Sequence, residues 1–105
     1  MVNAEQWQWN EIQQVGTDYT DLSEVENYDR RMSTFRDVDA ENRAILETLA
    51  LPGGATILEI GCGTGQFARA AARSGLTVTA VDVSPLMVDY AAQKAEAENV
   101  GNVEF

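Results

Sequence analysis

The residues of this sequence that could do chemistry gather around one glycine-rich stretch, residues 61–65, which reads Gly-Cys-Gly-Thr-Gly. An apolar, strand-like run precedes it and a helical pattern follows it. Glycines let a ligand approach the backbone, and the start of a helix attracts anionic groups. Asp82 ends the next apolar run, 76–81, and parallel neighbouring strands would place its carboxylate beside the loop. The pattern predicts a site where Asp82 accepts hydrogen bonds from ribose hydroxyls.

The glycine spacing favours one kind of nucleoside ligand. Dinucleotide-binding loops read G-x-G-x-x-G, and Gln66 occupies the place of the third glycine here. The G-x-x-x-x-G-K-[ST] pattern of phosphate-binding loops is absent as well. A mononucleoside ligand without a pyrophosphate therefore fits better. The plainer alternative is a strand–turn–helix joint in which Asp82 is only a solvated cap.

The elements that must position this loop follow from hydrophobic periodicity. Val25, Tyr28, Met32 and Phe35 predict a helix over about 23–36, with Ser23 and Glu26 as a capping box. A second helix is expected after Asp39, burying Ile45, Leu46 and Leu49, and residues 1–21 are expected to be irregular or a short helix. Buried strands are predicted at 55–60, 76–81 and 103–105, and helices at 66–74 and 85–98. Strands separated by single helices imply an α/β fold with a parallel sheet.

Composition narrows the partners and the location. The 105 residues hold 7 Lys plus Arg against 17 Asp plus Glu, a net charge of −10, and no histidine. This charge argues against nucleic-acid binding by this portion, and the missing histidine excludes an imidazole base, so we expect no metal site. One cysteine and the absence of an export signal favour a cytoplasmic protein. No apolar run is long enough to cross a membrane.

Two stretches also resemble a known family. ILEIGCGTGQFA and VTAVDVSPLMVDYAAQKA closely resemble the first two motifs of class I S-adenosylmethionine-dependent methyltransferases, over about residues 40–105. NYDRRM and FRD resemble, more weakly, the helical cap that often precedes that core. The resemblance implies a Rossmann-like parallel sheet preceded by N-terminal helices. Residues 1–39 would form the cap segment. Residues 40–105 would form a partial core with the first three strands, truncated before the fourth.

The resemblance also implies roles for single residues. Glu59 would hold the amino end of the methionine moiety, and Asp82 would hold the ribose. The loop residues Gly61, Cys62, Gly63, Thr64 and Gly65 would line the cofactor, Val83 and Met87 would flank the adenine, and Tyr28 would close over the methionine carboxylate. Three of these have plainer alternatives, in which Glu59 is a strand-end charge, Cys62 a small filler with a neutral thiol, and Tyr28 a core residue. The catalytic residues would lie beyond residue 105.

The implied function is methyl transfer from S-adenosylmethionine, with a small molecule as the expected acceptor. This portion alone would be catalytically silent. Without a fourth strand, strand 56–60 would expose an edge, so self-association is expected. Two alternatives stay open: a nicotinamide-dependent oxidoreductase, and a non-catalytic nucleoside-binding or protein-interaction module of the same fold.

Overall fold

The computed structural model describes residues 20–105, which form four helices and three strands. In chain order these are α1 (Leu22–Ser33), α2 (Val38–Leu49), β1 (Thr56–Ile60), α3 (Gln66–Arg73), β2 (Thr77–Val81), α4 (Pro85–Ala97) and β3 (Val103–Glu104). The predicted order and the α/β class are confirmed. The prediction for residues 1–21 falls mostly on residues 1–19, outside the described residues. Within 20–105, no helix has the length and apolar character to cross a membrane.

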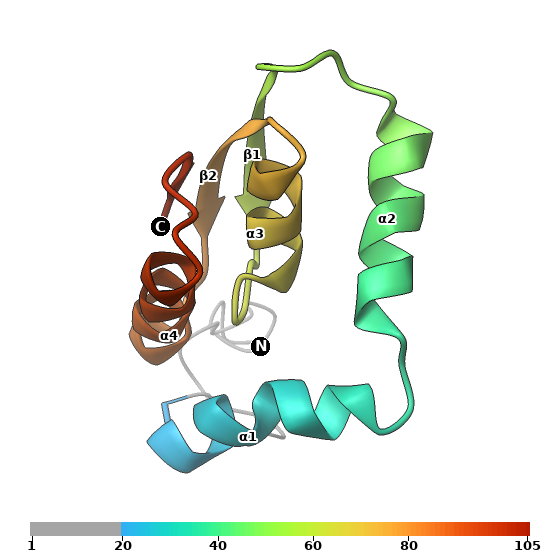
Figure 1. Cartoon of the computed structure of the whole chain (residues 1–105). Helices are drawn as coiled ribbons and strands as arrows, with labels where there is room; N and C mark the ends of the chain where they lie inside the picture. Colours follow the sequence, from blue (N-terminus) through green and yellow to red (C-terminus); the bar gives the residue numbers. More distant parts are fainter. Residues whose placement is uncertain (1–19) are drawn as a thin grey trace, which may run out of the picture.

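The three strands form a parallel sheet in the order β1-β2-β3. The register pairs Thr56 with Thr77 and Ile60 with Val81, so β1 and β2 end side by side. In Figure 1, α3 and α4 lie against the sheet, α2 runs beside α3, and α1 crosses the end of the sheet toward which β1 points. This arrangement brings α1 close to the loop that follows β1.

Small side chains let α3 approach the sheet closely. Ala68, Ala71 and Ala72 are buried against Val78 and Ala80 of β2. Alanine has no long side chain to hold the helix away from the strands, so the helix and the sheet pack closely although each side chain is small. The resulting core fixes the first turn of α3, and therefore the glycine loop, relative to β2.

The opposite face of the sheet is uncovered by the described elements. Leu58 is 63% exposed and Ile60 80% exposed, so the prediction of a fully buried strand at 55–60 is wrong for these two side chains. The physical reason is that β1 has β2 on one side only, and α3 covers only the face carrying Ile57. Side chains of alternate residues point to opposite faces, which leaves Leu58 and Ile60 outside.

Helix α1 begins and ends differently from the prediction. Its N-cap is Asp21, whose carboxylate accepts hydrogen bonds from the backbone N–H and the hydroxyl of Ser23 at 2.9 and 2.7 Å. The predicted capping box of Ser23 and Glu26 is therefore wrong, because the helix begins earlier, at Leu22, with Asp21 as its N-cap. The helix ends at Ser33, before Phe35, which is 67% exposed and not on a buried face.

Helix α2 starts at Val38, two residues earlier than predicted. Asp37 is its N-cap and accepts from the backbone N–H of Ala40 at 3.1 Å. Leu46 packs against the core as expected, but Ile45 and Leu49 are exposed, which corrects that prediction. A straight helix beside α3 turns one stripe of side chains toward the core, and these two residues lie outside that stripe.

The start of α4 agrees with the sequence prediction. The hydroxyl of Ser84 accepts a hydrogen bond from the backbone N–H of Met87 at 3.2 Å, and Pro85 occupies the first helical turn. Met87 and Ala91 are buried on the apolar face of this helix. Local capping signals of this kind act over a few residues, which is why they are readable from sequence.

Gly65 is the glycine on whose missing side chain the packing depends most. It has a φ of +80°, and a Cβ there would lie 2.8 Å from Cβ of Ala91 and 2.9 Å from the ring of Phe105. We predict that Gly65→Ala lowers the free energy of unfolding by about 2–4 kcal/mol, combining the left-handed backbone penalty with overpacking. Urea denaturation followed by circular dichroism would measure it.

Gly53→Ala is the matched control, because a Cβ at Gly53 would meet nothing within 4 Å and its φ lies outside the left-handed region. Its stability should stay within about 0.5 kcal/mol of the original chain. Equal losses in the two variants would contradict the packing role assigned to Gly65.

Candidate nucleoside-binding site

The glycine loop is held against the end of β2 by its own backbone. The N–H groups of Gly61 and Cys62 both donate to the carbonyl of Val81, at 2.8 and 2.9 Å. The N–H of Gly63 donates to Oδ2 of Asp82 at 2.8 Å. The prediction that the Asp82 carboxylate lies beside the loop is therefore confirmed.

The second oxygen of Asp82 is fixed as well. Oδ1 accepts from the backbone N–H of Ser84 at 2.9 Å. One oxygen thus contacts the loop after β1, and the other contacts the N-cap of α4. Each carboxylate oxygen has two acceptor sites, so both can still accept a further hydrogen bond. The carboxylate is oriented in advance of any ligand.

A cleft of about 210 Å³ lies next to this loop. It is lined by Tyr28, Met32, Arg36, Val38, Asn42, Glu59, Gly61, Cys62, Gly63, Thr64, Gln66 and Phe67. Six of the ten predicted site residues are therefore together, and they come from α1, the end of β1 and the loop. Tyr28 is the notable member, because it reaches the loop from an element more than 30 residues earlier in the chain.

The other predicted residues are placed differently. Gly65 lies against Ala91 and Phe105, where its lack of a side chain allows close packing. Val83 is exposed just after Asp82, and Met87 is only 3% exposed. A ligand contact by Met87 would use it as the buried floor of an adenine pocket. The cofactor roles of all ten residues stay predictions.

Glu59 is the electrostatically unusual residue of the site. Burial, together with the nearby charge of Asp82, raises the pKa of its carboxyl to about 7. Its Oε2 atom is buried and has no hydrogen-bond partner within the described part of the chain. A buried acceptor without a partner is costly, so this oxygen is suited to a donor that is brought in by a ligand.

Cys62 is an inert member of the loop. Burial raises the pKa of its thiol to about 11, and the charges of Asp82 and Glu59 contribute in the same direction. This direction of the pKa agrees with the neutral thiol expected from the sequence. A thiol held neutral is a poor nucleophile, so Cys62 acts as a small filler between the glycines.

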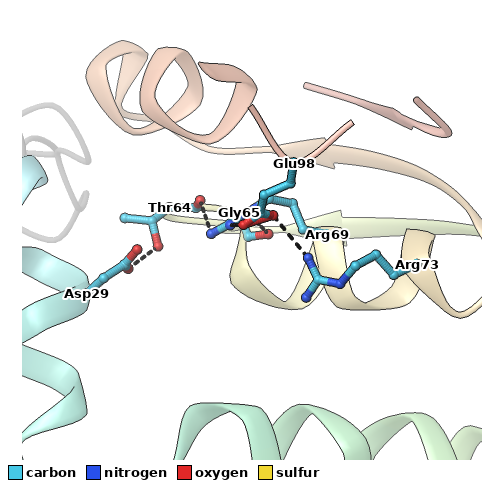
Figure 2. Close-up of polar contacts among 6 residues, drawn as sticks. All are labelled: Asp29, Thr64, Gly65, Arg69, Arg73 and Glu98. Atoms are coloured by element: carbon cyan, nitrogen blue, oxygen red, sulfur yellow. Dashed lines mark hydrogen bonds and ion pairs between the residues drawn. The ribbon is translucent and has the colours of Figure 1, made fainter. Parts of the chain in front are cut away.

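Sequence reasoning missed a group of charged residues that hold the loop from behind (Figure 2). The guanidinium of the buried Arg69 donates to the carbonyls of Gly65 and Thr64, at 3.2 and 3.3 Å. It also donates to Glu98 at 2.6 Å, and Arg73 donates to the other oxygen of Glu98 at 3.0 Å. A single arginine on the buried alanine face of α3 was the one available signal. Its partner Glu98 is 29 residues away and gave none.

Two further residues near the loop also escaped the sequence reasoning. Asp29 of α1 accepts a short hydrogen bond from the hydroxyl of Thr64 (Figure 2). Arg36 lines the loop cleft and forms an ion pair with Glu41 at 2.6 Å. Both follow from the path of α1 across the end of the sheet, which no local pattern in the sequence shows.

A strand, a glycine loop and a helix, with an acid from the next parallel strand bonded to the loop, define a Rossmann-like nucleoside-binding unit. Comparisons with known proteins specify the family. Residues 57–105 match the methyltransferase domain family. The resemblance drawn from the sequence is confirmed: this part of the chain is similar to the class I S-adenosylmethionine-dependent methyltransferases.

Individual relatives agree with this assignment. A putative methyltransferase of a Geobacillus species is 47% identical over 53 residues, covering 50% of this chain and 21% of that protein. An S-adenosyl-L-methionine-dependent Diels-Alderase of Talaromyces variabilis is 44% identical over 52 residues, covering 50% of this chain and 18% of that protein. This chain therefore spans about a fifth of the length of such relatives.

A solved structure shares the fold. The methyltransferase of Geobacter sulfurreducens in complex with S-adenosyl-L-homocysteine matches with a TM-score of 0.58 and 28% identity, covering 63% of this chain and 27% of that one. The match extends the likeness from the motif residues to the backbone that carries them.

The raised pKa of Glu59 predicts a pH dependence of stability. Between its ordinary pKa near 4.5 and its folded value of about 7, the native state keeps a proton that the unfolded chain has lost. Stability contributed by this group therefore falls as the pH rises through that range. We predict that Glu59→Gln removes this fall, so that the advantage of the variant grows from pH 5 to pH 8. Urea denaturation at each pH would measure it.

Glu47→Gln, on the exposed side of α2, serves as the control for this experiment. Its stability should follow the original chain at every pH. A Glu59→Gln profile parallel to the original would show that the Glu59 carboxyl titrates normally.

Proposed function

We propose that this chain is the cofactor-binding part of an S-adenosylmethionine-dependent methyltransferase that methylates a small molecule. The observation that carries the proposal is the hydrogen bond between Asp82 and the N–H of Gly63. This bond brings together a carboxylate that can bind ribose hydroxyls and a glycine loop whose backbone a ligand can approach closely. The family assignment of residues 57–105 supports the same cofactor.

The buried oxygen of Glu59 tests whether the residues present fit this cofactor. Oε2 has no partner within residues 20–105 and lies beside the loop cleft. The amino group of the methionine moiety is a cationic donor that would satisfy it. Binding such a cation favours the ionised carboxyl and so opposes the rise in pKa that burial causes. The match of a donor-bearing cation to an unpartnered acceptor supports the assignment.

The opposite end of the amino-acid moiety is a carboxylate, and the cleft offers it a cation. Arg36 lines the cleft together with Tyr28. We infer that the two residues receive this carboxylate, with the Tyr28 hydroxyl donating and Arg36 supplying charge. Arg36 is exposed and now pairs with Glu41, so a second carboxylate can share its several donors.

The chemistry asked of the chain is modest. When bound, S-adenosylmethionine supplies a methyl group already activated by its sulfonium charge. The residues of this chain bind and orient it through Asp82, Glu59 and the loop backbone. Orientation can account for much of a rate enhancement when the reacting groups are aligned. We propose that other parts of the methyltransferase core bind the methyl acceptor.

The acceptor is proposed to be a small molecule. The net charge of −10 disfavours a nucleic-acid acceptor, because binding to phosphates depends on cationic surface. We also propose a cytoplasmic location, which the single cysteine supports. Residues 1–39 are proposed to form the cap and 40–105 the core, with this boundary falling in the first turn of α2.

A second candidate function shares the cofactor but not the reaction. The similarity to an S-adenosyl-L-methionine-dependent Diels-Alderase favours it, because that protein's name denotes a Diels–Alder reaction and not a methyl transfer. In this case the protein would bind S-adenosylmethionine and use it without transferring the methyl group. Tight cofactor binding with no methylated product from any acceptor would separate this function from the first.

The role of Asp82 gives the direct test of the proposed function. We predict that Asp82→Ala weakens S-adenosylmethionine binding about ten- to a hundred-fold, because a charge-assisted contact worth roughly 1.5–3 kcal/mol is lost. Isothermal titration calorimetry would measure the affinity, and urea denaturation would show how much stability the loop loses. Asp89→Ala, an exposed position on α4, is the control and should bind as the original does. Unchanged affinity in Asp82→Ala would refute the proposal.

We also propose that the chain self-associates through β1. Among the described residues, β1 pairs with β2 alone, and the exposed Leu58 and Ile60 add apolar surface beside the free edge. Edges of this kind pair with a strand from a second copy.

We predict that Leu58→Lys shifts the chain toward monomer, because a charge on this face opposes the approach of a second copy. Sedimentation velocity over a concentration series would measure the shift. Ala92→Lys adds the same charge on the exposed side of α4 and should leave the association unchanged. A chain that sediments as a monomer at every concentration would show that β1 does not pair.

A further inference from the structure

Helix α1 is tied to the glycine loop by one hydrogen bond between side chains distant in sequence. The hydroxyl of Thr64, in the middle of the loop, donates to Oδ1 of Asp29 (Figure 2). The two residues are 35 positions apart. The bond therefore depends on how α1 lies on the core, and Thr64 is one of the residues that line the loop cleft.

The surroundings of α1 make this bond important for its position. A cleft of about 810 Å³ separates the side of α1 carrying Asp29 and Ser33 from α3, whose Gln66 and Arg73 line the other wall. Over this cleft the two helices do not pack directly on each other. Val25 is fully buried and anchors the beginning of α1. Asp29, one turn later, bonds to the loop, and α1 also packs against α4.

The opposite side of Thr64 is held rigidly. Its carbonyl accepts from Arg69, which is buried and also holds Gly65 and Glu98. The backbone of the loop is thus fixed to α3 and α4, and the Thr64 hydroxyl is the group left to contact α1. A donor fixed on the core thus meets an acceptor on a helix that a cleft separates from α3.

Tyr28 connects this contact to the ligand cleft. It precedes Asp29 in α1 and lines the cleft with Glu59, Gly61 and Gly63. Whatever fixes Asp29 on the loop also fixes Tyr28 beside it, because adjacent residues of one helix turn move together.

We propose that the hydrogen bond between Asp29 and Thr64 is a latch that holds α1 over the glycine loop, so that both are positioning residues for cofactor binding. The proposal rests on the proposed function and deepens it. Asp29 and Thr64 act through the placement of Tyr28 rather than by contacting the reacting groups. The latched state binds the cofactor better than the open state, and by linkage the cofactor favours latching.

A double-mutant cycle on cofactor affinity tests the latch. Asp29→Ala removes the acceptor, and Thr64→Val removes the hydroxyl while keeping the shape of the side chain. Each should weaken S-adenosyl-L-homocysteine binding by about tenfold or more, the expected loss for a hydrogen bond to a charged group. The double variant should bind no more weakly than either single one, because the same bond is broken in all three.

Conservative variants and a stability measurement separate positioning from mere structural support. Thr64→Ser keeps the hydroxyl donor, and Asp29→Asn keeps an oxygen acceptor. Each should bind S-adenosyl-L-homocysteine within about threefold of the original affinity. Glu26→Ala, exposed on the same helix, is the control and should not change affinity. Losses in the free energy of unfolding without losses in affinity would overturn the latch, as would additive effects in the double variant.

Hydrogen exchange on the unmodified protein gives a readout that does not depend on the variants folding. Amide exchange in residues 22–33 should slow when S-adenosyl-L-homocysteine is added, and this slowing should be absent in Thr64→Val. Binding by the original with no change in these amides would overturn the latch and leave the proposed function standing. A failure of the original protein to bind at all would instead overturn the proposed function, and the latch with it.

Discussion

The structure depends on one constraint, the attachment of the glycine loop to the carboxyl end of β2. Three consecutive loop N–H groups, those of Gly61, Cys62 and Gly63, donate to Val81 and Asp82. These bonds turn the chain sharply after β1 and set where α3 begins. The close packing of α3 on the sheet then requires alanines on that helix and a glycine at position 65. The positions of the glycine loop, α3 and Asp82 therefore depend on one another, and a change in any of them affects the others.

Features that depend on near neighbours could be predicted from the sequence. The three strands, the N-cap at Ser84 and the convergence of Asp82 on the loop all follow from local patterns and from the rules of parallel sheets. The errors lie where several local signals compete. Ser23 resembles a cap, but Asp21 is an equally good one and stands where the helix actually begins. No local rule chooses between them.

The remaining misses are contacts that only the tertiary arrangement creates. Asp29 with Thr64 and Arg69 with Glu98 are 35 and 29 residues apart, and neither Asp29 nor Glu98 alone shows in the sequence which residue it will contact. The exposure of Leu58 has the same origin, because it depends on which elements cover the second face of the sheet. A single sequence shows that a side chain is apolar or charged. The partner that it finds depends on crossing angles and helix paths, which emerge only when the whole chain is packed.

The backbone donors of the loop also explain why a ligand without a phosphate fits this site. Dinucleotide loops keep their N–H groups free for a pyrophosphate. Here Val81 and Asp82 accept from three of them, and the N–H of Gly65 donates to the carbonyl of Cys62. The place of an incoming anion is taken by the protein's own carboxylate. Glu59 adds a second acid beside it, and one of its oxygens has no hydrogen-bond partner among residues 20–105. Two carboxylates next to a loop with few free donors disfavour a pyrophosphate and favour a ligand that brings hydroxyls and a positive charge. S-adenosylmethionine has both, and the oxidoreductase alternative would require a loop whose donors are free.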